Sequence, residues 1–164
     1  MTRNEKRLCD KLTKLSFASD WEIVRNEWDF EYEYEVDIEE RRSCLCGKTP
    51  IKFMCVIKNQ NTGVEAEVGS ECVKNFLCMS EDLELYQVLK KLKDNISVSV
   101  NNAVLSLSYS QRVVNDWENN FYKDRMRKRK ATIKQIIKKE SINRKILNNY
   151  SKQFKQCPYL NPIL

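Results

Sequence analysis

The chain has 164 residues, of which 41% are hydrophobic and 32% charged, and this balance is typical of a folded globular protein with a net charge of +6. The chain has seven cysteines and no histidine. The absence of histidine excludes the Ser-His and Cys-His nucleophile systems, and we expect no enzymatic activity. No apolar run suits a signal peptide or the roughly 20 residues of a membrane span, which predicts a cytoplasmic protein (in a host cytoplasm if viral) without a membrane partner.

The first predicted elements are a helix and a strand. Residues 4–16 carry three leucines at helical spacing. In residues 28–39, aromatic or β-branched residues alternate with acidic residues without a break, which predicts a strand with one apolar and one acidic face. The acidic face is either solvated or a surface that docks a basic segment.

Residues 43–78 predict a compact unit built around a β-hairpin. One strand covers 51–58, a turn covers 59–63 and a second strand covers 64–68. Ser70 is the expected cap of a short helix that follows. The buried face of this helix should consist of Val73, Phe76 and Leu77.

The second half of the chain is predicted to be helical and basic. A helix starts at Ser80, a short extended link covers 96–100, and the helical pattern from about 103 onward is interrupted near 108–111. A thin apolar stripe runs through the basic part and consists of Ile133, Ile136, Ile137, Ile142 and Ile146. We therefore divide the chain into residues 1–79 and residues 80–164.

The cysteines of the first half predict a zinc site of the treble-clef type. Cys44 and Cys46 directly precede Gly47, and Cys72 lies in the first turn of the expected short helix. The glycine lets the backbone bend so that amides can face thiolate sulfur, and a helix N-terminus favours the thiolate form of a cysteine. Without histidine, zinc must be bound by cysteine or, less often, by a carboxylate.

The fourth ligand is a choice between Cys55 and Cys78, and we prefer Cys55. Cys55 lies on the first hairpin strand, whereas Cys78 is about a third of a turn out of phase with Cys72. The alternative for Cys55 is a small buried side chain. The predicted metal ligands are Cys44, Cys46, Cys55 and Cys72, with Zn²⁺ or iron as the metal, and we expect Cys9 and Cys157 to be free thiols.

Two motifs resemble a family of small uncharacterised proteins of bacteriophages and bacteria. Residues 44–77 contain Cys-x-Cys-Gly followed by Val68-Gly69-x2-Cys72-Val73-x2-Phe76, which resembles the zinc-binding module of that family. Residues 113–147 contain Trp117-Glu118-x2-Phe121-Tyr122 followed by basic pairs, which resembles its C-terminal helical segment. The resemblance implies a phage- or virus-type protein with a structural, cysteine-bound metal and defines no fourth ligand.

The charge is concentrated near the C-terminus. Residues 122–155 contain 13 Lys and Arg against 2 Asp and Glu, a charge of +11, while the rest of the chain carries −5. A cationic helix can contact phosphates and release counterions, and neighbouring aromatic rings can stack on bases. The alternative is a solvated face with the aromatic residues in the core. The predicted nucleic-acid contacts are Arg125, Arg127, Lys128, Arg129, Lys130, Lys134, Lys138, Trp117 and Tyr122.

Together these patterns predict an α+β fold with a small antiparallel sheet, a treble-clef-like zinc site and a largely helical, basic C-terminal half. The favoured function is a zinc-dependent accessory protein that binds nucleic acid, with DNA and RNA not distinguished. The first alternative is a protein-interaction module, such as a phage factor that binds a host protein through the acidic strand or the isoleucine stripe. A zinc hydrolase is a weaker alternative, because a cluster made only of cysteines is usually structural.

Overall fold

The computed structural model describes residues 1–154, 157 and 160, apart from the side chain of Arg127. It is an α+β structure with one three-stranded antiparallel sheet and a largely helical C-terminal part, as predicted. The described chain forms two compact units, Met1–Leu83 (unit 1) and Glu84–Leu164 (unit 2). The division falls inside helix α4 (Ser80–Asp94).

Two helices precede the sheet of unit 1. Helix α1 (Arg3–Thr13) starts with a capping box, in which Thr2 and Glu5 each accept a backbone N–H of the other, and it buries Leu8 and Leu12. The helix predicted over 4–16 is therefore present, but it ends at Thr13, so Leu15 lies outside it. Helix α2 (Trp21–Asn26) was not predicted; Asp20 caps it by accepting the N–H of Glu22.

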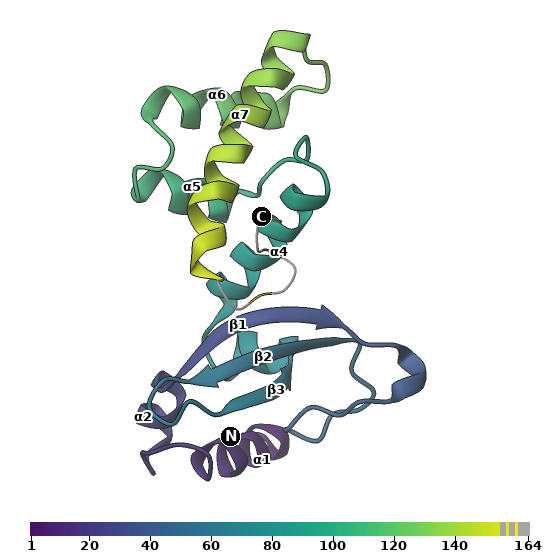
Figure 1. Ribbon diagram of the computed structural model, residues 1–164, viewed down its shortest axis with the longest axis vertical. Helices are drawn as coiled ribbons and strands as arrows, with labels where there is room; N and C mark the ends of the chain where they lie inside the picture. The colour runs from purple at the N-terminus through teal and green to yellow at the C-terminus, as the bar shows by residue number, and fades with distance from the viewer. Residues whose placement is uncertain (155–156, 158–159, 161–164) are drawn as a thin grey trace. The chain divides into compact units, whose positions relative to one another are not determined.

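The sheet contains β1 (Trp28–Glu35), β2 (Phe53–Asn59) and β3 (Glu65–Gly69), in the order β1-β2-β3 (Figure 1). A short 3-10 helix, η1 (Ile38–Glu40), follows β1. The predicted hairpin is confirmed as the antiparallel pair β2-β3. The central strand β2 is buried along most of its length, since it has a neighbour on each side.

The predicted division of β1 into an apolar and an acidic face is wrong. The register between β1 and β2 shifts between Phe30 and Tyr32, which is the mark of a β-bulge. An extra residue in one strand turns the following side chains to the opposite face. Trp28 and Phe30 are buried before the bulge, whereas after it Glu33 is buried and Tyr32 is half exposed.

Helix α3 (Ser70–Asn75) directly follows β3, as predicted, but its cap differs from the prediction. The capping residue is Gly69, without a side-chain cap, and Ser70 is the first residue of the helix. Cys72 and Val73 are buried on one side of the helix, and Leu77 is buried just after it. The direct turn from strand to helix brings Cys72 back beside the end of β3.

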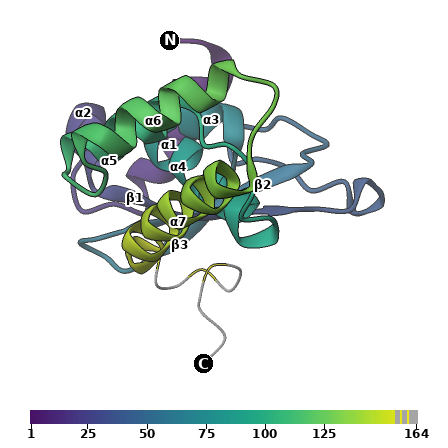
Figure 2. The same ribbon diagram turned by 90° about the horizontal axis from the view of Figure 1, so that it is seen from above.

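Unit 2 holds the rest of α4 and three further helices, each with a side chain that caps its start. Asn101 caps α5 (Asn102–Ser110), while capping boxes start α6 (Asp116–Arg127) and α7 (Ile133–Tyr150). The segment 128–132 joins α6 to α7 (Figure 2), and a short 3-10 helix, η2 (Ser151–Gln153), ends the described helical part. One interruption lies at 111–115, slightly later than the sequence predicted, and the second, at 128–132, was not predicted.

The core of unit 2 is formed by one side of each long helix. On α4 the buried side chains include Tyr86, Leu89 and Leu92, which the helical spacing predicted. On α7 only part of the isoleucine stripe is buried. Ile142 and Ile146 are fully buried, whereas Ile133, Ile136 and Ile137 are 77%, 42% and 60% exposed. The N-terminal part of α7 therefore has an uncovered apolar side within unit 2.

Candidate metal centre and basic surface

The Cys44–Gly47 segment is a tight turn that makes the unusual Cys-x-Cys spacing workable. The N–H of Gly47 donates to the carbonyl of Cys44 over 2.8 Å, and the N–H of Cys44 donates to the carbonyl of Lys48 over 3.0 Å. Gly47 has a φ of 91°, in the region that favours glycine. The turn reverses the chain so sharply that the side chains of Cys44 and Cys46 reach the same place.

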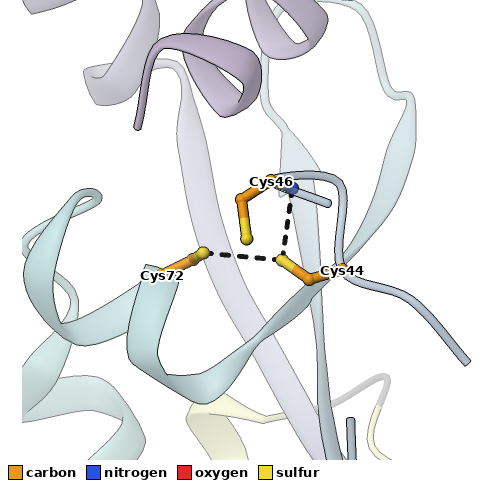
Figure 3. A group of neighbouring side chains, drawn as sticks. All are labelled: Cys44, Cys46 and Cys72. Carbon is orange, nitrogen blue, oxygen red and sulfur yellow. Dashed lines mark hydrogen bonds between the residues drawn. The ribbon is translucent and has the colours of Figure 1, made fainter. Parts of the chain in front are cut away.

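The structure brings Cys44, Cys46 and Cys72 together at one point. Their sulfur atoms all lie within 4.8 Å of one another, and the sulfurs of Cys44 and Cys72 are 3.4 Å apart. Figure 3 shows the turn and helix α3 directing the three side chains toward a common centre. Each residue is at most 3% exposed. This is a group of three buried cysteines that could hold a metal ion.

Backbone amides and neighbouring thiols favour the thiolate form of Cys44. The Cys44 sulfur accepts the N–H of Gly69 over 3.1 Å and that of Cys46 over 3.5 Å. The hydrogen bond with Cys72 lowers the pKa of Cys44 most; burial raises this pKa, and the two amides lower it, leaving a value of about 5. The same contact, together with burial, raises the pKa of Cys72. These contacts favour ionisation of Cys44 over that of Cys72.

Cys55, the preferred fourth ligand, is not part of this group. It lies in the middle of β2, opposite Glu33 on one side and Val68 on the other, and it is fully buried. Burial raises its pKa far above the ordinary range of a thiol. In this position Cys55 corresponds to the alternative reading, a small buried side chain in the sheet.

The other cysteines also lie outside the group. Cys78, the second choice for a fourth ligand, is exposed, has a φ of 58° and accepts a long hydrogen bond of 3.8 Å from Arg25. Cys9 and Cys157 are unbridged, as predicted; the Cys157 thiol donates to the hydroxyl of Tyr86 over 3.5 Å. Within the described residues, the three-cysteine group is the one set of His, Cys, Asp or Glu side chains close enough together to bind a metal ion.

The chemistry of the donor set fits a soft or borderline metal ion. Thiolate sulfur prefers zinc, copper(I) or iron over magnesium or calcium, which take oxygen ligands. The amide contacts to Cys44 are of the kind that orient a ligand and offset its charge. The three cysteines come from segments 28 positions apart in the chain, so an ion bound here would cross-link the turn to the β3-α3 junction.

The predicted nucleic-acid contacts fall into two groups. Arg129, Lys130 and Lys134 are exposed and make no ion pair within the described part of the chain. The others are engaged within unit 2. Lys128 pairs with Asp124 over 2.7 Å, and Arg125 donates to Gln135 over 3.4 Å. The side chain of Arg127 lies outside the described residues.

Glu118 ties α6 to α7 through two of the cations. Its carboxylate is 3.5 Å from the ammonium of Lys138 and 2.9 Å from that of Lys145. Burial alone would raise the pKa of Glu118, but hydrogen bonds from Lys145 and the N–H of Asn115, with the charges of both lysines, leave it lowered. Lys138 therefore takes part in the contact between α6 and α7 through its ion pair with Glu118. Sequence reasoning missed Glu118, although its place three residues after Asn115 is a capping-box signal.

The two predicted aromatic contacts differ. Trp117 is 59% exposed; its ring stacks on Phe121 at 5.3 Å, and the ammonium of Lys138 lies 5.0 Å from its centre. Tyr122 is fully buried, so the prediction that it stacks on bases is wrong. Its hydroxyl accepts the N–H of Val100 over 2.9 Å and donates to Asn143 over 2.6 Å. Helical spacing alone did not reveal which of the two rings faces the core.

A buried polar cluster of unit 1 was also missed by sequence reasoning. The carboxylate of Glu27 accepts the N–H groups of Phe17 and Ala18 over 2.9 and 2.7 Å and the amide of Asn59 over 2.9 Å. The Asn59 carbonyl oxygen in turn accepts the N–H groups of Asn61 and Thr62, each over 2.9 Å. This cluster shapes the hairpin turn and ties it to the loop after α1.

Comparisons with known proteins do not place the chain in a family. No family model, no curated protein and no solved structure matches it. Within the described residues, no helix combines the length and the apolar character needed to cross a membrane.

Proposed function

We propose that the protein is a zinc-dependent nucleic-acid-binding accessory protein, in which a treble-clef-like metal module supports a cationic helical unit. The proposed metal site is supported by the convergence of three buried cysteine sulfurs at one point. Zn²⁺ is the favoured ion because it is stable without redox chemistry and accepts thiolate ligands at tetrahedral geometry. Iron is the rival, and the resemblance to small phage proteins agrees with a structural role for the metal.

The proposed nucleic-acid binding is supported by the charge of unit 2 and by three exposed cations that make no ion pair within the described residues. Unit 2 has 17 Lys and Arg against 6 Asp and Glu, a charge of +11, whereas unit 1 has 12 against 17, a charge of −5. Arg129, Lys130 and Lys134 lie close together around the start of α7 and are exposed. Phosphate groups are the natural counterions of such a cluster. Of the two rings predicted to stack on bases, Trp117 is the exposed one.

The metal half is tested by elemental analysis of the purified protein and its Cys→Ser variants. We expect about one equivalent of zinc in the wild type, as for a single site. Cys44→Ser, Cys46→Ser and Cys72→Ser should each lose most of it, whereas Cys55→Ser and the matched control Cys9→Ser should retain it. Zinc loss in Cys55→Ser with retention in Cys72→Ser would reverse the ligand assignment.

The nucleic-acid half is tested by the salt dependence of binding to single- and double-stranded DNA and RNA. Replacing Arg129, Lys130 and Lys134 by Ala should weaken binding and reduce the slope of log K against log salt by about 2.7 on duplex DNA, at about 0.9 per phosphate contact. A control with Lys6, Lys11 and Lys14 replaced by Ala removes the same charge from exposed positions of unit 1. Equal losses in both variants, or affinity that is independent of salt, would exclude the proposed contact.

A protein-binding function is the second candidate, and the exposed isoleucines favour it. Ile133, Ile136 and Ile137 form an uncovered apolar side on α7, and phosphate contacts do not use such a surface. Pull-down from nuclease-treated lysate should then capture a partner that is lost from an Ile133→Ser, Ile137→Ser variant. Replacement of Arg129, Lys130 and Lys134 should leave capture of the same partner unchanged, since apolar contacts depend little on charge.

A further inference from the structure

A cavity of about 170 Å³ lies against the three-cysteine group. Its lining includes Cys44, Cys46 and Cys72 together with Lys48, Phe53 and Ser70. A single water needs only roughly 10–15 Å³ of such space, so this cavity has room for a ligand of several heavy atoms. The three sulfurs point toward a common centre (Figure 3), and a space large enough for an outside molecule borders these cysteines.

Three protein ligands leave one position of a tetrahedral ion for another donor. Within the described residues, the group of side chains able to bind a metal at this point has three members. Glu71 also lines the cavity, but its carboxylate accepts a hydrogen bond from Asn75 over 3.2 Å and it is not part of the group. Cys55 is held in the sheet. The cavity is thus the side from which a fourth donor can approach.

We propose that this cavity admits a thiolate from outside the chain as the fourth ligand of the bound metal. An ion with three thiolate ligands is matched best by another soft donor. The added negative charge is offset in part by Lys48, which lines the cavity, whereas Lys52 already pairs with Glu35 over 3.2 Å; the side chains of Phe53 and Ile51 suit the apolar carbon next to a thiol sulfur. This inference rests on the proposed metal site and goes beyond a purely structural role for it.

The test uses the full-length protein loaded with Co²⁺, whose visible and sulfur-to-metal absorption reports the ligand set. The probes are 2-mercaptoethanol and a short peptide with one cysteine, which distinguish a small thiol from a partner's side chain. A response to either probe supports the proposal. The expected response is a rise of about one third in the sulfur-to-cobalt absorption, because a fourth thiolate joins three at a tetrahedral ion.

A bulky residue in the cavity gives a sharper comparison. Ser70→Leu should bind Co²⁺ like the wild type but lose most of the thiol response, since Ser70 lines the cavity. Lys74→Leu is the matched control on the same helix, is exposed and does not line the cavity; it should respond like the wild type.

The possible failures are distinguishable. Stoichiometric Co²⁺ binding with no spectral change from either thiol would overturn the proposal while leaving the metal site intact. A four-thiolate spectrum before any thiol is added, changed by Cys55→Ser, would overturn it by assigning the fourth position to Cys55. Absence of Co²⁺ binding in the wild type would overturn the metal site and the proposal together.

Discussion

The arrangement of the three cysteines depends on single residues with special backbone conformations. Gly47 has a φ of 91° and closes the turn that carries Cys44 and Cys46. A Cβ at this position would lie 2.7 Å from the Nη1 atom of Arg7. A side chain at position 47 would therefore strain the turn and displace the flexible end of the Arg7 side chain.

Gly47→Ala should weaken metal binding by about tenfold, because a left-handed backbone costs a non-glycine residue about 1–2 kcal/mol. Competition with a chelator of known affinity measures the change. Gly63→Ala is the matched control: Gly63 also has a positive φ, of 72°, but nothing lies within 4 Å of its added Cβ and it is remote from the cysteines. Equal loss of metal affinity in both variants would contradict a local role for Gly47.

Tyr122→Phe should destabilise unit 2 by about 1–3 kcal/mol, because the N–H of Val100 and the side-chain oxygen of Asn143 would lose their buried partner. Urea unfolding followed by circular dichroism measures the loss. Trp117→Phe is the control, since this ring is largely exposed, and it should change stability little. A loss of nucleic-acid affinity in a stable Tyr122→Phe protein would restore Tyr122 as a contact.

At the scale of elements, the hairpin of unit 1 depends on buried polar groups as well as on strand pairing. Asn59 ends β2 fully buried, and Glu27 lies just before β1 at 5% exposure. The hydrogen bond from Asn59 lowers the pKa of Glu27 most; burial raises it, and the N–H groups of Phe17 and Ala18 lower it. The net effect is a carboxylate that is held ionised and fixes the loop after α1 to the sheet.

This shift predicts an acid-dependent stability. Because the folded-state pKa of Glu27 lies below its unfolded value, its stabilising contribution is present above the unfolded pKa and is lost as the pH falls through the folded pKa. The free energy of unfolding of Glu27→Gln, measured from neutral pH to about pH 3, should fall less steeply than that of the wild type. Glu22→Gln, at an exposed position of α2, should follow the wild type; parallel curves for all three proteins would contradict the prediction.

The bulge in β1 shows how one inserted residue changes which side chains of a regular alternating sequence are buried. An alternating sequence predicts that every second side chain shares a face. The register shift after Phe30 instead places Glu33 opposite Cys55 in a buried part of the sheet. The alternating run contains no glycine or proline, the residues that commonly mark a bulge, so the sequence offered no sign of the bulge.

At the scale of the whole molecule, the chain combines two units of opposite charge. The three-cysteine group lies wholly within unit 1, and Arg129, Lys130 and Lys134 lie within unit 2. Since a site that forms only on folding contributes its binding free energy to stability, the proposed metal should stabilise unit 1 and not unit 2.

Removal of the metal with a chelator should therefore lower the melting temperature of unit 1 while leaving the helical unit 2 near its original value. Calorimetry resolves the two transitions. The fluorescence of Trp28, which is 2% exposed, assigns the first to unit 1 when Trp21 and Trp117 are replaced by Phe. The Cys72→Ser protein without chelator is the matching control and should behave like the chelated wild type. A chelator effect confined to unit 2 would contradict the assignment.

Much of the fold and part of the candidate site were predictable from local patterns. The helix at the N-terminus, the hairpin at 51–68 and the start of α4 at Ser80 appear where propensity and periodicity placed them, whereas the break at 128–132 was not predicted. Cys44, Cys46 and Cys72 were identified because a turn glycine and a helix start lie next to them. Cys55 and Tyr122 were misjudged because their burial depends on partners such as Val68 and Asn143, which are distant in sequence.

The sequence by itself determined most of the elements, the charge separation and the absence of histidine ligands, since these depend on neighbouring residues and on composition; helix α2 and the break at 128–132 were not predicted. Only the tertiary structure decided which sulfurs meet, which cations stay free and which face of β1 is buried. The physical reason is that burial and side-chain contact are set by packing between segments far apart in the chain. A bulge in β1 or a salt bridge to Glu118 changes burial and side-chain contacts without changing the local sequence pattern.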